Sequence, residues 1–574
     1  MLTLLTGIAA GLAAIFFRAL IALFHNFLFL GKLSFSYDAT VHTPPSPLGP
    51  FVVLVPVVGA LGVAYLVKNF APEAKGHGVP EVMDAIHYNR GRMRPIVAVV
   101  KSLASALSIG SGGSIGREGP IVQIGSAFSA AIGDLLDLPT WQRITLIAAG
   151  AGGGIAATFN TPVGGLLFAL ELMLHEVSVR TLVPVTIATV TATYIGQIAF
   201  GPHPAFVIPA FESPFFHLMN PLVLLAYAGL GVITGLVAAL FIRALYSFEA
   251  IFERRVRGGY YGQHCLGMFL VGIMFYSLML TAGHYYVQGV GYATIQDILS
   301  GKQIGFVLLL LLFGLKLLAT SLTLGSGASG GVFSPSLFMG ATVGAAYGTA
   351  LRMLAPSLDI NPAAFAVVGM AGVVGASTAA PVTAIVMIFE MTLDYRVVVP
   401  MTLTVAVSYG IRRAMITESI YARKLVLRGH PVPDALQNSI YLTLAAKSLM
   451  DTRIEPVAAT ETVEKLASRY GQDGPDWFLV VDHGRIVGWL QGHDRWENKG
   501  CPDRKMGEIA RRDFCFVQES TPLGSVCRIM HRENASVALV ASDGQISPDQ
   551  VKGLIDTGRI AGAVGEANEA FEAD

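Results

Sequence analysis

A glycine- and serine-rich stretch occurs twice in the chain, and its residue types suit one of two chemistries. The first copy, residues 110–120, reads GSGGSIGREGP, and the second, residues 325–335, reads GSGASGGVFSP. Identical residues recur at a constant offset of 215 positions, as from Gly116 to Gly331 and from Pro120 to Pro335. Either a serine acts as a nucleophile, or the glycines open the N-terminus of a following helix to an anion.

The serine chemistry lacks a base. Ser114 and Ser329 both fit the G-x-S-x-G pattern of serine hydrolases, which need a histidine within reach of the hydroxyl. Downstream of Ser329 the histidines are His430, His483, His493 and His531, all at or beyond the end of the apolar part of the chain. Ser114 is followed by His175 and others. However, a nucleophile duplicated at a site without a base is better explained as a bend, and we expect no enzyme.

The anion chemistry explains more of the pattern. A helix that starts after a glycine break presents unpaired N–H groups and about half a positive charge. Close helix packing is the simpler explanation, but it does not require a proline at the same place in both copies. Glu118 lies in the first turn of one such helix, where its repeat partner is the uncharged Phe333. A carboxylate among glycines at membrane depth competes with an anion, so we predict a gate or proton carrier rather than a simple capping acid.

The composition predicts a polytopic membrane protein that positions these breaks. The chain has 574 residues, of which 53% are hydrophobic and 14% charged, and its mean hydropathy is +0.59. The net charge of zero argues against a nucleic-acid partner. Four cysteines, Cys265, Cys501, Cys515 and Cys527, show no metal-ligand spacing. The first apolar run, Leu2 to Leu30, is too long for a signal peptide and predicts a membrane helix.

The membrane part is itself repeated. Apolar segments recur from 2–30 to 397–411, and several are too short to cross about 30 Å as one helix. Pro162 and Glu171 recur as Pro381 and Glu390 at an offset of 219. We therefore expect two homologous halves, at about 75–205 and 290–430, with the substrate site at their interface near the midplane.

Basic residues and a change of composition predict the rest of the organisation. Arginine and lysine cluster at 90–94, 254–257 and 412–428, which places these ends and the C-terminal region in the cytoplasm. Beyond a linker at 429–446, strand-like runs at 477–482, 486–490, 536–541 and 551–555 follow helical patterns at 461–470 and 521–532. This predicts an α/β domain at 447–565, before a disordered acidic tail at 566–574.

Four ordered motifs resemble the CLC family of chloride channels and proton-coupled chloride transporters. They are Gly76-His77-Gly78-Val79-Pro80, Gly116-Arg117-Glu118-Gly119-Pro120, Gly331-Val332-Phe333-Ser334-Pro335 and the region of Tyr421. The resemblance covers residues 1–428. It implies an all-α membrane domain of two inverted repeats with broken helices, assembled as a homodimer with one anion pathway in each subunit. The C-terminal part resembles the paired CBS modules that many members carry.

The resemblance also implies roles for these residues. Backbone N–H groups of Arg117 to Gly119, and of Val332 and Phe333, would hold chloride, and the Tyr421 hydroxyl would add a donor. The Glu118 side chain would be the external gate, which moves in and out of the anion site. No cofactor is required. An adenine nucleotide at the CBS-like pair is an option that the residue order around Asp556 argues against.

Two departures from the family pattern bear on mechanism. His77 replaces the central serine of the first motif, so either its backbone alone serves the anion or its imidazole makes transport depend on pH near about 6–7. Leu172 stands where many proton-coupled members carry an inner proton-accepting glutamate, and leucine cannot carry a proton. The sequence therefore favours a passive, selective chloride channel. The alternative is a chloride/proton antiporter with a non-standard inner proton route.

One further alternative and the location complete the expectations. The membrane part could serve only as an anchor for a nucleotide sensor, but the duplicated pore motifs argue against this. The short N-terminus and compact loops favour a prokaryotic plasma membrane. The partners that we expect are the lipid bilayer, a second copy of the chain, chloride and, for the antiporter, protons.

Overall fold

The computed structural model describes the chain except residues 176, 207, 209–220, 303, 359, 432–443, 471–473, 493–502, 543–546 and 561–574. The chain folds into two compact units, Met1–Val432 and Pro433–Asp574. The predicted linker, 429–446, contains this division. Its residues 432–443 and the predicted acidic tail lie outside the described residues.

The first unit is helical, and many of its helices are long and apolar enough to cross a membrane. In the described part of the chain six stretches meet this criterion by length and composition: Leu2–Leu30 (α1), Gly49–Phe70 (a 3-10 turn and α2), Val179–Phe200 (α8), Pro221–Arg255 (α9), Gly259–Ala282 (α10) and Phe306–Gly325 (α12). About 20 apolar residues in a helix span the hydrocarbon core of a bilayer. The observed lengths therefore confirm an integral membrane protein.

The remaining helices of this unit, several of which begin at the breaks that the sequence predicts, complete it. They are α3 (Val79–His87), α4 (Ile96–Gly110), α5 (Glu118–Leu135), α6 (Thr140–Phe159), α7 (Pro162–Phe168), α11 (Tyr292–Leu299), α13 (Phe333–Leu354), α14 (Pro362–Thr378), α15 (Pro381–Thr392), α16 (Val398–Met415) and α17 (Ala422–Leu427). Proline lies in the first turn of α3, α7 and α15, where its missing N–H would have no partner within the helix.

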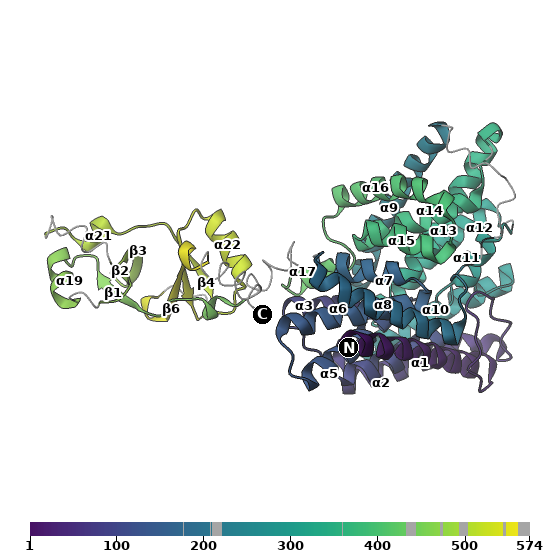
Figure 1. Ribbon diagram of the computed structural model, residues 1–574, viewed down its shortest axis with the longest axis horizontal. Helices are drawn as coiled ribbons and strands as arrows, with labels where there is room; N and C mark the ends of the chain where they lie inside the picture. Colours follow the sequence, from purple (N-terminus) through teal and green to yellow (C-terminus); the bar gives the residue numbers. More distant parts are fainter. Residues whose placement is uncertain are drawn as a thin grey trace. The chain divides into compact units, whose positions relative to one another are not determined.

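The order of helices in the first half recurs in the second. Helices α3 to α8 correspond to α11 to α16, because α5 starts 215 positions before α13 and α7 starts 219 positions before α15. In Figure 1 the purple and blue helices of the first half and the teal and green helices of the second half occupy separate regions of this unit.

The same glycine crossing holds helices together in each half. A Cβ atom on Gly125 of α5 would overlap the Gly150 carbonyl of α6, and one on Gly340 of α13 would overlap the Gly369 carbonyl of α14. Small residues let the backbones of membrane helices approach this closely. The recurrence of the crossing confirms that the two halves share one packing plan.

Reciprocal glutamate caps join the two halves. The Glu171 carboxylate accepts the N–H groups of Val382 and Thr383 at 3.2 and 2.7 Å, at the start of α15. Its repeat partner Glu390 accepts the N–H groups at the start of α7, from Val163 at 3.1 Å and Gly164 at 2.6 Å. An exchange of equivalent contacts is what two-fold symmetry produces. The two repeats are therefore related by a pseudo-two-fold axis.

The second unit contains two small sheets with the same connectivity. The first sheet has β1 (Ile454–Ala458) parallel to β2 (Trp477–Asp482), which is antiparallel to β3 (Arg485–Gln491). The second has β4 (Phe514–Gln518) parallel to β5 (Val537–Ala541), which is antiparallel to β6 (Val551–Asp556). Helix α19 (Val463–Tyr470) joins β1 to β2, α22 (Leu523–Arg532) joins β4 to β5, and the short α21 (Met506–Ile509) precedes β4.

Alternating side chains explain how these sheets are buried. Phe478 and Val480 of β2 pack with α19, whereas Trp477 and Leu479 face the other way and pack with Val537 and the rest of the second sheet. Each sheet thus buries one face against a helix and the other against its partner sheet. The predicted helix–strand–strand units are confirmed, and each gains a leading strand, β1 or β4, that the sequence did not reveal. The predicted fold class, an all-α membrane domain of broken helices in two repeats plus an α/β domain, is confirmed.

Candidate functional site

The two glycine-rich stretches pair with each other at the centre of the first unit. The N–H of Gly116 donates to the Gly331 carbonyl, and the N–H of Gly331 donates to the Gly116 carbonyl, both at 2.7 Å. This short antiparallel bridge brings the starts of α5 and α13 together. Because these two N–H groups already donate to carbonyls, the N–H groups left without a backbone acceptor among the described residues are those that follow them, at Arg117 to Gly119 and at Val332 and Phe333.

The loop before α3 joins the same centre. The Gly76 N–H donates to the Ala328 carbonyl at 3.0 Å, and the Gly76 carbonyl accepts the Gly330 N–H at 3.2 Å. Gly78 has a φ of +85°, and a Cβ there would lie 2.6 Å from the Gly119 carbonyl oxygen. Val79 and Pro80 then form the first turn of α3. Only glycine fits both the backbone angle and this approach, so the start of α3 lies directly against the start of α5.

The Glu118 carboxylate is bound at the start of α13. Its Oε1 accepts a hydrogen bond from the Tyr292 hydroxyl at 2.7 Å and another from the Ser334 hydroxyl. Its Oε2 accepts the Ser334 N–H at 3.3 Å. The side chain is buried, with 2% of its surface exposed. Helix N-termini favour negative charge, so the carboxylate occupies a position that suits an anion.

Tyr292 and Ser334 are functional candidates that the sequence reasoning missed. Their hydroxyl oxygens lie 2.6 Å apart, so both are held beside the carboxylate. A signal for Tyr292 was present, because it lies 215 positions after His77 and is therefore its repeat partner. Ser334 lies within the third motif, between Phe333 and Pro335. The hydroxyls of both residues therefore hold the Glu118 carboxylate at this end of α13.

Tyr421 and His77 are both buried near the same helix starts. Tyr421 precedes α17, and its hydroxyl has no hydrogen-bond partner among the described residues. The His77 ring packs edge-on against Tyr246 at 6.3 Å between centroids, and its Nδ1 has no partner in the described part of the chain. Each side chain therefore retains an unused polar group in the interior.

Two buried lysines support the loops that carry these residues. Lys101 of α4 donates to the carbonyls of Ala74 at 3.0 Å and Gly76 at 2.8 Å. Its repeat partner, Lys316 of α12, donates to the carbonyls of Val287 and Gly289 at 3.2 and 2.9 Å. Neither side chain is exposed to solvent. A buried cation is costly unless negative charge compensates it, so both lysines favour an anion nearby. The sequence analysis did not single out these lysines, although each stands alone in an apolar run and the two are 215 positions apart.

Leu172 lies buried in a π-helical turn, Ala169–Leu174, that continues α7. The neighbouring Glu171 caps α15 with both carboxylate oxygens. His175 ends the turn with a left-handed φ of +50°. The carboxylate among the described residues of this turn, Glu171, is therefore engaged as a helix cap.

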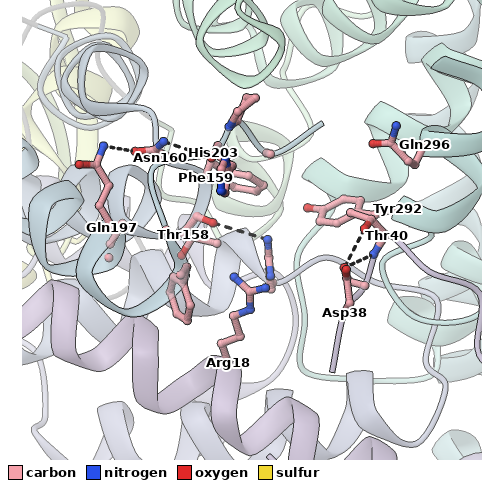
Figure 2. A pocket seen from close by; sticks show the side chains of 18 residues that line it. Arg18, Asp38, Thr40, Thr158, Phe159, Asn160, Gln197, His203, Tyr292 and Gln296 are labelled. Carbon is pink, nitrogen blue, oxygen red and sulfur yellow. Dashed lines mark hydrogen bonds between the residues drawn. The ribbon is translucent and has the colours of Figure 1, made fainter. Parts of the chain in front are cut away.

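A cavity of about 300 Å³ leads to the other side of Tyr292, and Arg18 and Arg117 both line it. In Figure 2, Arg18 rises from α1 with Thr158 on one side and Asp38 and Tyr292 on the other. Arg117 lies over the Tyr292 ring, with its guanidinium carbon 5.3 Å from the ring centroid. Two guanidinium groups at a concave entrance raise the local concentration of anions.

Comparison with known proteins identifies relatives of the membrane unit. The family model for voltage gated chloride channels matches residues 59–413. A putative chloride channel protein, ClcB-like, from Ralstonia nicotianae is 32% identical over 377 residues, covering 65% of this chain and 85% of that protein. The H(+)/Cl(−) exchange transporter ClcA of Vibrio cholerae is 32% identical over 413 residues, covering 70% of this chain and 84% of that protein.

Solved structures share the fold. A slow cyanobacterial Cl−/H+ antiporter superposes with a TM-score of 0.64 at 24% identity, covering 74% of this chain and 97% of that one. A eukaryotic CLC transporter superposes with a TM-score of 0.62 at 20% identity, covering 97% of this chain and 96% of that one. The second likeness extends over the C-terminal α/β unit as well as the membrane unit.

Proposed function

Because the chain belongs to the CLC family and moves chloride across a membrane, we propose that it does so as a chloride/proton antiporter. It is not an enzyme. The sequence favoured a passive channel, because Leu172 stands at the usual inner proton position. The antiporter alternative is now better supported, since most of the similar curated proteins are H(+)/Cl(−) exchange transporters.

One observation carries the proposal: the Glu118 carboxylate is bound by the Tyr292 hydroxyl, the Ser334 hydroxyl and the Ser334 N–H. When Glu118 takes up a proton it loses its negative charge, and the positive end of α13 no longer favours it. The neutral side chain leaves, and a chloride ion takes its place on the backbone N–H groups at the starts of α5 and α13. Deprotonation and return of the carboxylate expel the chloride. One group thus links proton uptake to chloride movement.

We also propose the anion ligands. The proposed ligands are the N–H groups of Arg117 to Gly119 and of Val332 and Phe333, and what supports them is that none has a backbone acceptor among the described residues. The Tyr421 hydroxyl adds a donor farther along the pathway. Gly76, Gly78 and Gly119 shape the loops so that the backbones can approach. Donors of this kind replace hydration without a fixed charge that would trap the ion.

Assembly and orientation belong to the same proposal. We infer a homodimer with one pathway in each subunit, in a bacterial plasma membrane, with the C-terminal unit in the cytoplasm. The basic loop at 90–94 and the basic residues of α17 support this orientation, and the two curated relatives named above are bacterial. The mass of the purified protein in detergent tests the dimer.

The reversal potential of the purified protein in liposomes tests the transport mode. Under a chloride gradient, we expect the potential to move in a fixed ratio when a pH gradient is added. Glu118→Ala should remove the response to pH while chloride still flows. A wild-type reversal potential that follows chloride alone would contradict the antiporter and restore the channel.

A further inference from the structure

A buried histidine, His87, and a half-buried one, His175, meet at the π-helical turn of the first repeat. His87 ends α3 and His175 ends the turn, and their ring centroids are 5.9 Å apart. His87 is buried, with 3% of its surface exposed. The backbone of Met173 lies beside its ring, yet neither ring nitrogen makes a hydrogen bond of good geometry. A buried imidazole with two unused nitrogens is costly, and such groups call for a functional explanation.

Helix α3 connects this pair with the gate. At its start the backbone lies so close to α5 that a Cβ on Gly119, the residue after Glu118, would overlap the His77 carbonyl. At its end His87 packs against the turn that contains Leu172. Nine residues of helix span about 14 Å, so His87 lies about that far along α3 from the end that meets the gate. Water, or another side chain, must carry a proton over that distance.

Water can reach this end of α3. A cavity of about 710 Å³ is lined by Asp84 and Tyr88, which flank His87 on the helix, and by Gln123 of α5. The cavity also includes the basic loop at 90–94, which we assign to the cytoplasmic side. A proton from the cytoplasm therefore has an aqueous approach to the residues next to His87.

Other titratable groups on the elements around α3 are already engaged. On α3 itself, Glu81 pairs with Arg428 at 2.6 Å and Asp84 pairs with His430 at 2.6 Å. Glu171 on the turn caps α15. The remaining charged groups on the neighbouring helices are Arg143 with Asp134, Lys424 with Glu249, and Arg423 with Glu418. Each of these described groups has a partner, so His87 is the unpartnered proton acceptor at the cytoplasmic end of α3.

We propose that His87, together with His175, is the inner proton relay that exchanges protons between the cytoplasmic side and Glu118. This proposal rests on the proposed antiport. A neutral imidazole accepts a proton from water on one nitrogen and releases a proton from the other, so the ring returns to its neutral form after each transfer. The pair thus takes over a task that Leu172 cannot perform.

The test compares proton and chloride flux in the same liposomes. Chloride efflux is read with an electrode and proton uptake from the external pH, for wild type, His87→Gln, His175→Gln and the control His264→Gln. His264 is also buried, with one ring nitrogen bonded to Ser326 at 3.0 Å and the other without a partner, but it lies in α10. Glutamine keeps the polarity and approximate size of the side chain but cannot be protonated.

We expect His87→Gln to lower proton uptake about tenfold or more while chloride flux stays within about threefold, because a positioned proton carrier contributes at least this much. His175→Gln should also lower the ratio of proton uptake to chloride flux. If the His87→Gln protein is not monodisperse, His175→Gln replaces it as the test variant. The control should keep the wild-type ratio. An unchanged ratio in both test variants, or an equal loss of both fluxes, would overturn the relay and leave the antiporter intact. A wild type without proton uptake would overturn the antiporter, and the relay with it.

Discussion

Replacing Tyr292 with phenylalanine tests whether the Glu118 carboxylate and the chloride ion compete for the start of α13. The Tyr292 hydroxyl donates to Glu118 Oε1 at 2.7 Å, inside a site with almost no solvent exposure. A hydrogen bond to a charged group contributes about 1.5–3 kcal/mol. Two donors from Ser334 remain after the change, so the lower end of that range applies. Tyr292→Phe should therefore weaken carboxylate binding by about 1.5 kcal/mol, and because chloride competes with it, chloride should bind roughly tenfold more tightly.

Isothermal titration of the detergent-purified protein with chloride measures this change directly. Tyr285→Phe is the matched control, because that hydroxyl is also buried but accepts only the Ser46 N–H, at 3.0 Å. The control should bind chloride like the wild type. Weaker chloride binding by Tyr292→Phe would refute the reasoning, since it would mean that the hydroxyl serves the anion more than the carboxylate.

Three further predictions concern the scaffold. Glu171→Gln should destabilise the membrane unit by about 1–3 kcal/mol, because a charged cap of α15 is lost. Thermal unfolding in detergent should show a lower midpoint. An unchanged midpoint would mean that the cap adds no stability. Gly340→Ala should prevent monodisperse expression because its Cβ would overlap the Gly369 carbonyl, whereas Gly314→Ala, with nothing within 4 Å, should be tolerated. Burial, with a smaller effect of Glu533, raises the pKa of the Cys515 thiol in the C-terminal unit to about 11 from its ordinary value of 9.0. The folded unit therefore binds this proton more tightly than the unfolded chain, so stability should be complete below pH 9 and fall between about pH 9 and 11. Cys515→Ala should remove that fall, and a fall that persists in this variant would assign it to other groups.

The sequence predicted the parts of the site that depend on local patterns. Glycine spacing and first-turn prolines identified the helix starts, and the repeat offset paired them across the two halves. The donors to Glu118 were harder to predict from the sequence, because Tyr292 and Ser334 reach the carboxylate only in the folded protein, where the starts of α5, α11 and α13 meet. No local pattern in α5 specifies which hydroxyl will meet it. The repeat offset could have drawn attention to Tyr292, but not to its contact.

Strands β1 and β4 were missed for a different reason. Strand β1 is five residues long, contains Pro456 and buries one side chain, Val457, so it lacks a clear alternation of apolar and polar residues. Strand β4 alternates, but it is equally short and follows three charged residues, Arg511 to Asp513. Parallel pairing with β2 and β5 stabilises both strands, and such long-range pairing is not visible in a short sequence window.

The repeat pairs divide into those that match and those that have diverged, and the division follows function. Lys101 and Lys316 match, as do Glu171 and Glu390, and both pairs hold backbone in the two halves alike. Glu118 has diverged from Phe333, and His77 from Tyr292. A symmetric scaffold can bring two helix starts together, but it would treat the two membrane faces identically. Transport that exchanges one ion for another needs a gate that belongs to one half. Glu118, which the second half lacks, meets this need, and it is bound by Tyr292, which the first half lacks. Positions at which the two halves differ in sequence therefore indicate which residues make the two ends of an otherwise symmetric pathway different.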